Sequence, residues 1–353
     1  MNTFGSTLRL TTFGESHGTA MGGILDGLPP GIEISLREVD SQMARRRPGY
    51  SDITSPRREP DRVEFLSGLM GLENGALVPL SDTTDKALTL GTPIGFIIRN
   101  TDRRSADYDA LKDIYRPSHA DFAWERRFDG IRDWRGGGRS SGRETVCRVA
   151  AGAIARQVLE QTGVSIRAVL TAVGAATDPA LFAAEISRAA EENDSVGGIV
   201  ECRIQGFPAG IGDPVFGKLQ QRLAAAMLSI GAVKGFEYGD GFAIAAMRGS
   251  EAADPLRADD GRIKFSSNHS GGIQGGISNG EEIVFRVAFK PTPTVGCPLE
   301  TVNRNLENVT LRASGRHDPC VALRALPVVE AMAALALLDA ALGDGMRFAP
   351  SKR

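Results

Sequence analysis

The chain has 353 residues, of which 42% are hydrophobic and 24% charged, and its formal net charge is −2. This composition is typical of a soluble globular protein with a full core and argues against a chain that is basic throughout and binds polyanions. The four cysteines form no CxxC pair, which argues against a zinc site or a disulfide scaffold. We expect no signal peptide and no run long enough to span a bilayer, hence a cytoplasmic protein.

The first half of the chain indicates short strands and one helix. Alternating polarity predicts strands at 6–13, 22–28, 63–66 and 94–99. Ser35 can cap a helix that ends at Arg47, because Pro48-Gly49 follows. The segment 100–135 lacks strong periodicity, and segments of that length without it are usually functional.

The second half predicts strands at 164–173, 198–206 and 282–290, and helices at 179–192, 214–230 and 323–342. Two short stretches of the first half recur later in the same order. Residues 24–32 resemble 204–211, and Gly91-x-x-Ile94 resembles Gly280-x-x-Ile283. Either the chain is an internal duplication or similar turns coincide. A duplication would give a single domain over 1–353 with pseudo-twofold symmetry, and the alternating strands favour antiparallel sheets.

One glycine-rich stretch, 136–145, precedes a helix-spaced apolar run. Its three consecutive glycines allow positive φ and close approach to a ligand. Ser141 and Glu144 fit a capping box at the helix start, beside Arg139 and Arg143. Free N–H groups, the helix dipole and two cations favour an anion, best a phosphate. The spacing matches neither a P-loop nor a Rossmann fingerprint, and a turn without a ligand remains the alternative.

The histidines are few, and all lie in turns rather than in apolar runs: His17, His119, His269 and His317. Loop histidines on a rigid scaffold are candidates for acid–base chemistry near neutral pH. Each could equally be a structural histidine. Their spacing gives no zinc signature, so we expect no metal.

Three further loops, 268–280, 290–294 and 315–319, combine glycine or proline with hydroxyls and cations. They fit an enzyme that binds phosphorylated small molecules. The competing hypothesis is a non-catalytic phosphate- or nucleic-acid-binding module that uses Arg45–Arg47, Arg57-Arg58 and Arg126-Arg127 with Trp124. The net charge and the aromatic content of 6% count against nucleic acid.

Taken in order, six motifs resemble the chorismate synthase family from Gly5 to about Leu342. They lie at residues 12–18, 45–49, 116–121, 136–145, 267–272 and 315–320. The resemblance implies an α+β fold with helices between two four-stranded antiparallel sheets, assembled as a homotetramer. It implies a carbon–oxygen lyase that converts 5-enolpyruvylshikimate-3-phosphate to chorismate and phosphate by 1,4-anti elimination. The reaction depends on reduced FMN and is the last common step toward the aromatic amino acids.

The resemblance also implies roles by position. His17 is similar to the acid that assists phosphate departure, His119 to a histidine beside the flavin, and Asp318 to a carboxylate that assists proton removal. Arg46 and Arg47 resemble residues that contact NADP or substrate. The implied FMN ligands are Arg139, Ser140, Ser141, Gly231, Ala232, Gly275, Lys290, Pro291, Thr292, Pro293, Thr294 and Arg316.

No Rossmann fingerprint is visible, so we expect an external flavin reductase, with NADPH as an indirect electron source. Asp52 departs from the family pattern, which often has arginine there. Ser118 and Gly142 replace a usual glycine and a usual alanine. The segment 72–90 is longer than is usual in the family, and nothing in the sequence gives it a function.

Overall fold

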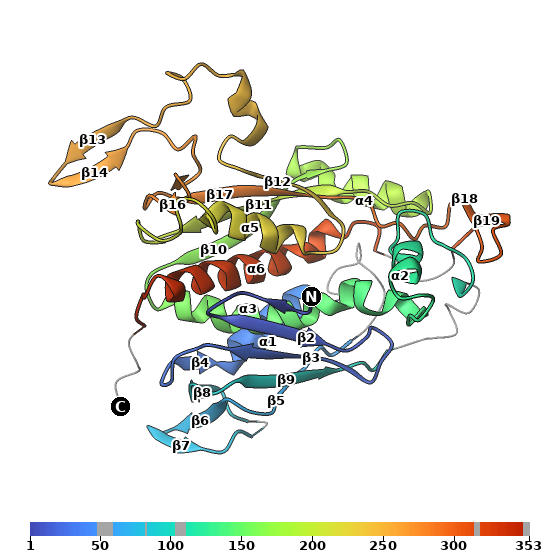
Figure 1. Ribbon diagram of the computed structural model, residues 1–353, viewed down its shortest axis with the longest axis horizontal. Coiled ribbons are helices and arrows are strands. Elements are labelled where there is room, and N and C mark those ends of the chain that lie inside the picture. The colour runs from blue at the N-terminus through green and yellow to red at the C-terminus, as the bar shows by residue number, and fades with distance from the viewer. Residues whose placement is uncertain (48–58, 82, 103–110, 314–317, 349–353) are drawn as a thin grey trace.

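The computed structural model describes residues 1–47, 59–81, 83–102, 111–313 and 318–348. These form a mixed α/β protein built on antiparallel sheets (Figure 1). The first sheet has the order β1-β2-β3-β9-β5. Its strands are β1 (Thr3–Phe4), β2 (Arg9–Phe13), β3 (Ala20–Asp26), β9 (Ile94–Arg99) and β5 (Val63–Phe65). The strands predicted in this part of the chain are confirmed, and β1 is an additional edge strand.

The second sheet has the order β10-β11-β17-β12. Its strands are β10 (Ser165–Val173), β11 (Gly198–Gln205), β17 (Ile283–Phe289) and β12 (Val233–Tyr238). A third sheet, β4-β8-β6-β7, contains β4 (Glu33–Ser35), β8 (Lys86–Thr89), β6 (Leu69–Glu73) and β7 (Ala76–Val78). The segment 72–90 therefore belongs mainly to this third sheet, which the sequence did not predict.

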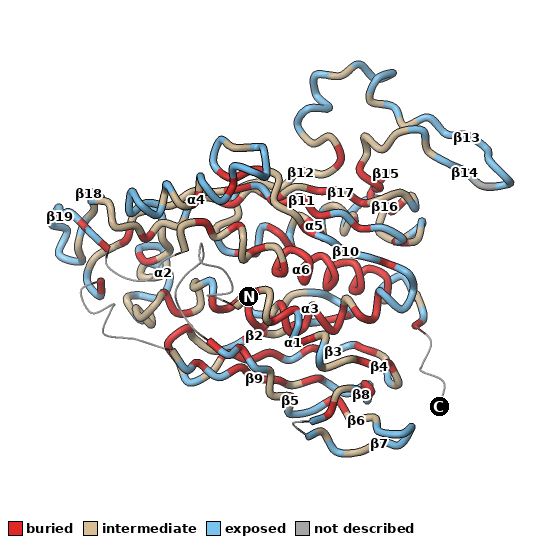
Figure 2. Tube along the Cα trace, turned by 180° about the vertical axis from the view of Figure 1, so that it is seen from behind, coloured by how far each residue is buried: buried red, intermediate tan, exposed pale blue. Residues whose placement is uncertain are grey.

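The remaining strands form three hairpins. The hairpin at residues 256–265 lies on an arm that projects from the body (Figures 1 and 2). The hairpins pair β13 (Leu256–Asp259) with β14 (Arg262–Phe265), β15 (Ile273–Gln274) with β16 (Ile277–Ser278), and β18 (Leu299–Val302) with β19 (Asn308–Leu311). We expected two four-stranded sheets around the helices. The structure instead has a five-stranded first sheet and a four-stranded second sheet, together with a separate third sheet.

Six α-helices occur in the described residues: α1 (Leu36–Arg46), α2 (Asp121–Arg127), α3 (Thr145–Glu160), α4 (Phe182–Glu191), α5 (Leu219–Leu228) and α6 (Ala322–Gly343). Figure 1 shows α1, α3, α5 and α6 between the first and second sheets. The tube in Figure 2 is buried along most of α6 and α3, so these two helices form the centre of the core.

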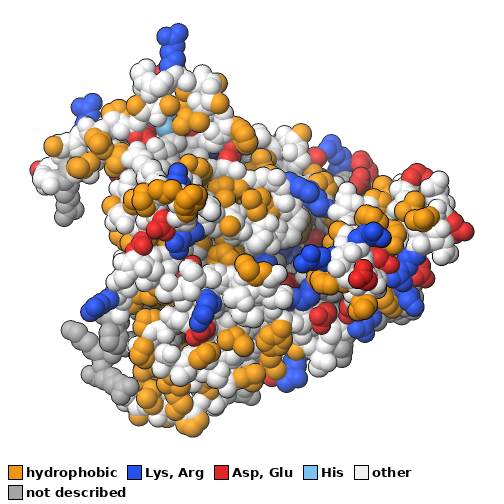
Figure 3. Space-filling model, viewed as in Figure 1, with side chains coloured by type: hydrophobic (Ala, Val, Ile, Leu, Met, Phe, Trp, Pro, Cys, Tyr) orange, Lys and Arg blue, Asp and Glu red, His pale blue; other side chains and the backbone are white. Residues whose placement is uncertain are grey.

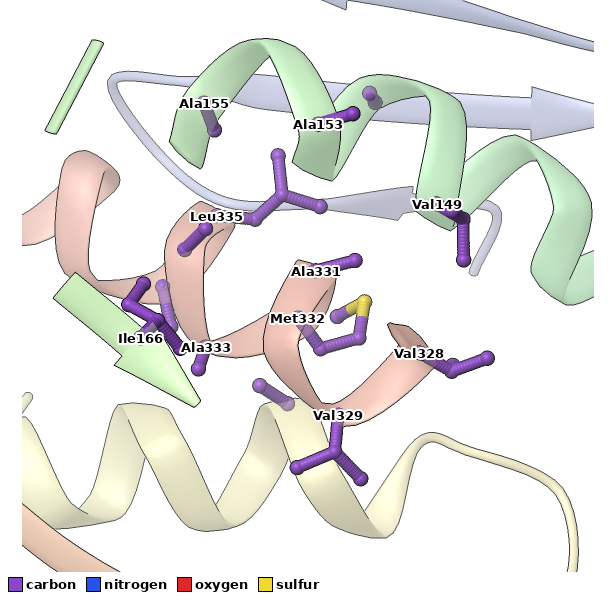
Figure 4. Packing of buried hydrophobic residues seen from close by; sticks show 14 of the residues in the cluster. Val149, Ala153, Ala155, Ile166, Val328, Val329, Ala331, Met332, Ala333 and Leu335 are labelled. Atoms are coloured by element: carbon purple, nitrogen blue, oxygen red, sulfur yellow. The ribbon is translucent and has the colours of Figure 1, made fainter. Parts of the chain in front are cut away.

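Close contact between α3 and α6 depends on small side chains. A Cβ on Gly152 would lie 2.5 Å from Cα of Ala331, a separation that real Cβ atoms do not show. Figure 4 shows Ala331 of α6 facing α3 near Ala153 and Val149. The two helices therefore approach so closely that no side chain fits between them at this point.

Several helix predictions need correction. The segment 100–135 is not wholly irregular, because α2 lies within it. The helix expected over 214–230 begins only at Leu219, because Gly217 has a left-handed φ of 82°. By length and composition α6 could cross a membrane, contrary to expectation, but 89% of its apolar window is buried inside the protein, as in a core helix.

The four cysteines are free thiols. Cys297 is half-exposed, whereas the other three thiols are buried.

Candidate active site

A cavity of about 990 Å³ lies where the N-terminal ends of α3 and α6 meet the first and second sheets. Its described lining contains eight basic side chains and only three acidic ones, Glu59, Glu144 and Asp318, so the cavity favours anions. Apolar side chains from Phe4, Trp124, Phe289 and Val328 supply a wall suited to a flat ring. Figure 3 shows that charged side chains on this face gather toward α2 and the β18–β19 hairpin.

The loop 136–138 contacts the two predicted catalytic histidines. Its glycines have φ of 59°, 86° and 53°, a left-handed backbone that other residues rarely adopt. A Cβ on Gly136 would lie 2.6 Å from Nε2 of His17, and one on Gly137 would lie 3.0 Å from Cε1 of His119. His119 lines the cavity, whereas His17 is 1% exposed and lies directly behind Gly136. The structure thus brings both histidines into contact with one turn, and only His119 lines the cavity.

His119 belongs to a buried charge network. Its Nδ1 lies 2.9 Å from Oδ1 of Asp121, and Arg116 binds both oxygens of that carboxylate at 2.7 and 2.9 Å. Burial lowers the pKa of His119, and nearby Arg116 lowers it too, although Asp121 opposes both. Asp121 would hold the neutral ring with its proton on Nδ1, which leaves Nε2 able to accept a hydrogen bond or a proton.

Two arginines of the cavity share one buried carboxylate. Arg46 donates to Asp61 at 2.9 Å, and Arg143 donates to the other oxygen of Asp61. Burial lowers the pKa of Arg46 to about 10, with Asp61 opposing, so Arg46 remains charged at neutral pH. Two guanidinium groups therefore lie at the cavity with Asp61 buried between them, and Glu59 lies 3.9 Å from Arg143 as a second counterion.

The predicted ligands of the 136–145 stretch lie together on the cavity wall. Arg139 donates to the hydroxyl of Thr12 at 2.7 Å and forms no ion pair with a carboxylate in the described part of the chain. The predicted capping box is only half correct. Ser141 caps a 3₁₀ turn by accepting from N–H of Arg143 at 3.3 Å, whereas Glu144 accepts from Thr12 and Arg148. The Glu144 side chain thereby ties the start of α3 to β2.

A second predicted group, Gly231-Ala232 and Lys290 with Thr292 to Thr294, lines the same cavity. Burial lowers the pKa of Lys290, and Lys234 adds to this. Ala232 has a left-handed φ of 71°, which is unusual for alanine. Thr292 is half-buried, but its Oγ1 is one of four buried side-chain polar atoms of the described residues that have no hydrogen-bond partner. A buried hydroxyl of this kind implies a missing partner, such as a bound ligand.

Other predicted residues lie elsewhere. Arg47, Gly275 and Pro291 do not line the cavity. Gly275 lies in the turn of the β15–β16 hairpin, away from the lining, and Arg47 donates instead to the carbonyl of Pro60. Asp318 lines the cavity and accepts from Arg324. Arg316, His317 and Asp52 lie outside the described residues. The described part of the chain contains no cluster of His, Cys, Asp and Glu that could hold a metal ion.

Three arginines that line the cavity were not predicted from the sequence as site residues: Arg116, Arg148 and Arg324. Arg148 and Arg324 sit inside helical runs, where charged residues ordinarily face solvent. Only their place in the first turns of α3 and α6, beside glycine-rich loops, could have indicated them.

The sequence matches known proteins along nearly its whole length. A profile of the chorismate synthase family matches residues 8–342. The chain belongs to the chorismate synthase family. Curated chorismate synthases from Porphyromonas gingivalis and Methylorubrum populi are 51% and 48% identical, covering 98% and 96% of this chain and 96% of each relative. A crystal structure of chorismate synthase superposes with a TM-score of 0.72 at 28% identity, covering 96% of this chain and 93% of that one.

As a chorismate synthase, the chain is a lyase that eliminates phosphate from 5-enolpyruvylshikimate-3-phosphate to give chorismate, in the shikimate pathway, and it depends on reduced FMN. The cavity fits that cofactor on independent grounds. Its excess of cations suits a phosphate, its apolar wall suits an aromatic ring, and the Thr292 hydroxyl lacks a partner.

Proposed function

We propose that phosphate elimination takes place in this cavity, with His17 and His119 as its acid–base groups in contact with the Gly136–Gly137 turn. Loss of a phosphate dianion requires neutralisation of the developing charge and a proton. Arg46 and Arg143 supply the charge, since both line the cavity and both bind Asp61, with Glu59 a further 3.9 Å ion-pair partner of Arg143. His17 supplies the proton from behind Gly136.

We further propose that Arg139, Ser140, Ser141, Ala232, Lys290 and Thr292 hold FMN. When bound, the reduced flavin supplies electron density that stabilises the electron-deficient allylic carbon of the substrate. The fixed backbone of the 136–140 loop and the Arg139 guanidinium orient the cofactor. Neutral His119 keeps Nε2 free of a proton beside the flavin, and Asp318, paired with Arg324, assists proton removal.

The placement of the two histidines around one glycine turn is the observation that carries this proposal. We expect His17→Ala to lower turnover by roughly 10²–10⁴-fold, the usual contribution of a general acid. Anaerobic phosphate release with photoreduced FMN measures it, with the flavin dissociation constant and the melting temperature as controls. Normal turnover in a folded, flavin-binding variant would remove His17 from the mechanism.

The order of elements supports an internal duplication of a single domain spanning 1–353. Each half contains four strands and two helices in the same order along the chain: β2, β3, α1, β5, β9 and α3 in the first half, and β10, β11, α5, β12, β17 and α6 in the second. The corresponding strands also pair in the same order within each sheet. Both repeated stretches fall at equivalent places. Residues 24–32 and 204–211 begin within the last residues of β3 and β11, and Ile94 and Ile283 begin β9 and β17. β1 is the extra strand that makes one sheet larger.

We also propose that the enzyme acts as a cytoplasmic homotetramer whose flavin is reduced by a separate reductase, with NADPH as the indirect electron source. In this proposal Arg46 and Arg47 contact substrate or nucleotide. Sedimentation of the purified protein tests the assembly. Anaerobic assay with NADPH and FMN, with and without an added flavin reductase, tests the electron source. Turnover with NADPH alone would contradict the requirement for a separate reductase.

A further inference from the structure

Asn100 lies at the end of β9 and is 5% exposed. Its Nδ2 donates to the carbonyl oxygens of Glu15 at 3.1 Å and Gly18 at 3.0 Å. Its Oδ1 accepts from Nε of Arg143 at 2.9 Å. One buried amide therefore connects the turn that carries His17 to an arginine that lines the cavity.

Arg143 is itself held firmly. It donates to Asp61 and to the carbonyl of Arg99 at 3.3 Å, and Asp61 also binds Arg46. These contacts fix the guanidinium through buried partners, independently of solvent. The bond from Arg143 to Asn100 therefore gives the 15–18 turn, which Asn100 holds, a fixed position relative to the guanidinium.

Besides the Asn100 amide, the Ser16 hydroxyl and the backbone of the turn 15–18 make hydrogen bonds, the hydroxyl to the carbonyl of Arg135 at 3.4 Å. N–H of Gly18 donates to the carbonyl of Glu15 at 2.9 Å, and N–H of Ser16 lies 3.4 Å from the carbonyl of Gly138. Without the Asn100 amide, the carbonyl of Gly18 would lose its side-chain donor and that of Glu15 would keep only the bond within the turn. Both residues are half-buried, and carbonyls there that lose a donor are destabilised, so the turn would shift to find others.

We propose that Asn100 is a positioning residue of the elimination, which holds the His17 turn at a fixed place relative to the Arg143 guanidinium and so to the substrate phosphate. This inference rests on the proposed role of His17. An asparagine suits the position because it is neutral, offers two donors to the turn and one acceptor to the arginine. Aspartate keeps the acceptor but loses both donors, and serine is too short to reach both sides.

Asn100→Asp in the full-length enzyme tests the link. A displacement of about 1 Å at a reacting group can cost ~10²-fold, so we expect kcat to fall roughly 10- to 100-fold. The FMN dissociation constant should change little, because none of the proposed FMN ligands bonds to Asn100. The matched control is Gln157→Glu, another buried amide that holds backbone, at Ser35, but outside the cavity; its kcat should stay normal.

A double-mutant cycle separates positioning from general destabilisation. If Asn100 acts through His17, Asn100→Asp lowers kcat in the native enzyme but adds little in the His17→Ala background. Equal losses in both backgrounds, or an unchanged kcat, would overturn the inference while leaving the role of His17 intact. Normal turnover of His17→Ala would instead overturn the proposed function, and the inference with it.

If Asn100→Asp does not fold, Asn100→Ser enters the same cycle, together with amide hydrogen exchange of the 16–18 segment. Faster exchange confined to this segment, with a loss of kcat that disappears in the His17→Ala background, supports the inference. Exchange unchanged from the native enzyme overturns it.

Discussion

Gly136 and His17 are in such close contact that a Cβ on Gly136 would lie 2.6 Å from Nε2 of the imidazole. The glycine also has a left-handed φ of 59°. The backbone of the 136–138 loop and the His17 ring therefore fit together only because residue 136 has no side chain.

We expect Gly136→Ala to displace His17 or the loop. Left-handed backbone costs roughly 1–2 kcal/mol for an alanine, and the overlap adds to this. Turnover should fall ~10²-fold, as for other small displacements of reacting groups. Steady-state kinetics and thermal melting measure the two effects separately, and a variant with native kcat would show that the contact is dispensable.

Gly142→Ala is the matched control from the same stretch. Gly142 does not have a left-handed φ, and nothing lies within 4 Å of its added Cβ. Replacing such a glycine reduces the entropy of the unfolded chain and should stabilise the protein by about 0.4–1 kcal/mol. A denaturant titration checks this, and marked destabilisation would contradict the open surroundings of Gly142.

Removing the partner of His119 should change the pH dependence. Asp121 opposes the burial that lowers the His119 pKa below 6.5, so Asp121→Asn should lower that pKa further. The fall in kcat on the acid side then moves to lower pH, because His119 stays neutral down to a lower pH. NMR titration of His119 and the kcat–pH profile measure the shift, with circular dichroism to confirm folding. A shift to higher pH would contradict the assigned pairing.

The same depressed pKa makes stability depend on pH. Between the folded and the unfolded pKa of His119, the unfolded chain binds more protons than the folded one. The contribution of neutral His119 is therefore complete above pH 6.5 and is lost as the pH falls below it. The unfolding free energy of the native enzyme should decline over that range more steeply than that of His119→Gln.

Thr292→Val should separate binding from folding. The Oγ1 of Thr292 is buried without a partner, so removing it should leave the melting temperature unchanged or slightly raised. If FMN supplies the partner, its dissociation constant should rise by about tenfold, the equivalent of one hydrogen bond. Flavin fluorescence titration measures it, and Thr171→Val, on β10 outside the cavity, is the control. Native FMN affinity would place the cofactor away from Thr292.

Gly152→Ala tests the core rather than the site. Its Cβ would overlap Ala331 across the α3–α6 contact, and overpacking of this kind costs roughly 1–3 kcal/mol. Thermal unfolding should occur at lower temperature, whereas Gly249→Ala, where nothing lies within 4 Å, should melt normally. Equal melting of the two variants would mean that α3 and α6 can move apart at no cost.

The sequence by itself determined the elements with strong local signals. The alternation of residues 283–289 fixes β17, and the side chain of Ser35 caps α1 as predicted, accepting from N–H of Glu38 at 3.2 Å. It also determined the family and its reaction, because glycine turns, histidines and arginines in fixed order carry that information locally. The short helix α2 and the third sheet were missed, because their stability comes from packing and not from local periodicity.

Tertiary structure alone decided which residues share the cavity. Asp61, Asn100 and Arg324 carry no local signal, since each becomes significant only through a partner distant in the chain. Tertiary structure also decided the partners of Glu144. Its buried carboxylate accepts from Thr12 and Arg148 instead of forming the expected capping box, because these are strong donors within reach. Local chemistry thus sets turns and caps, whereas burial and long-range hydrogen bonds set the site.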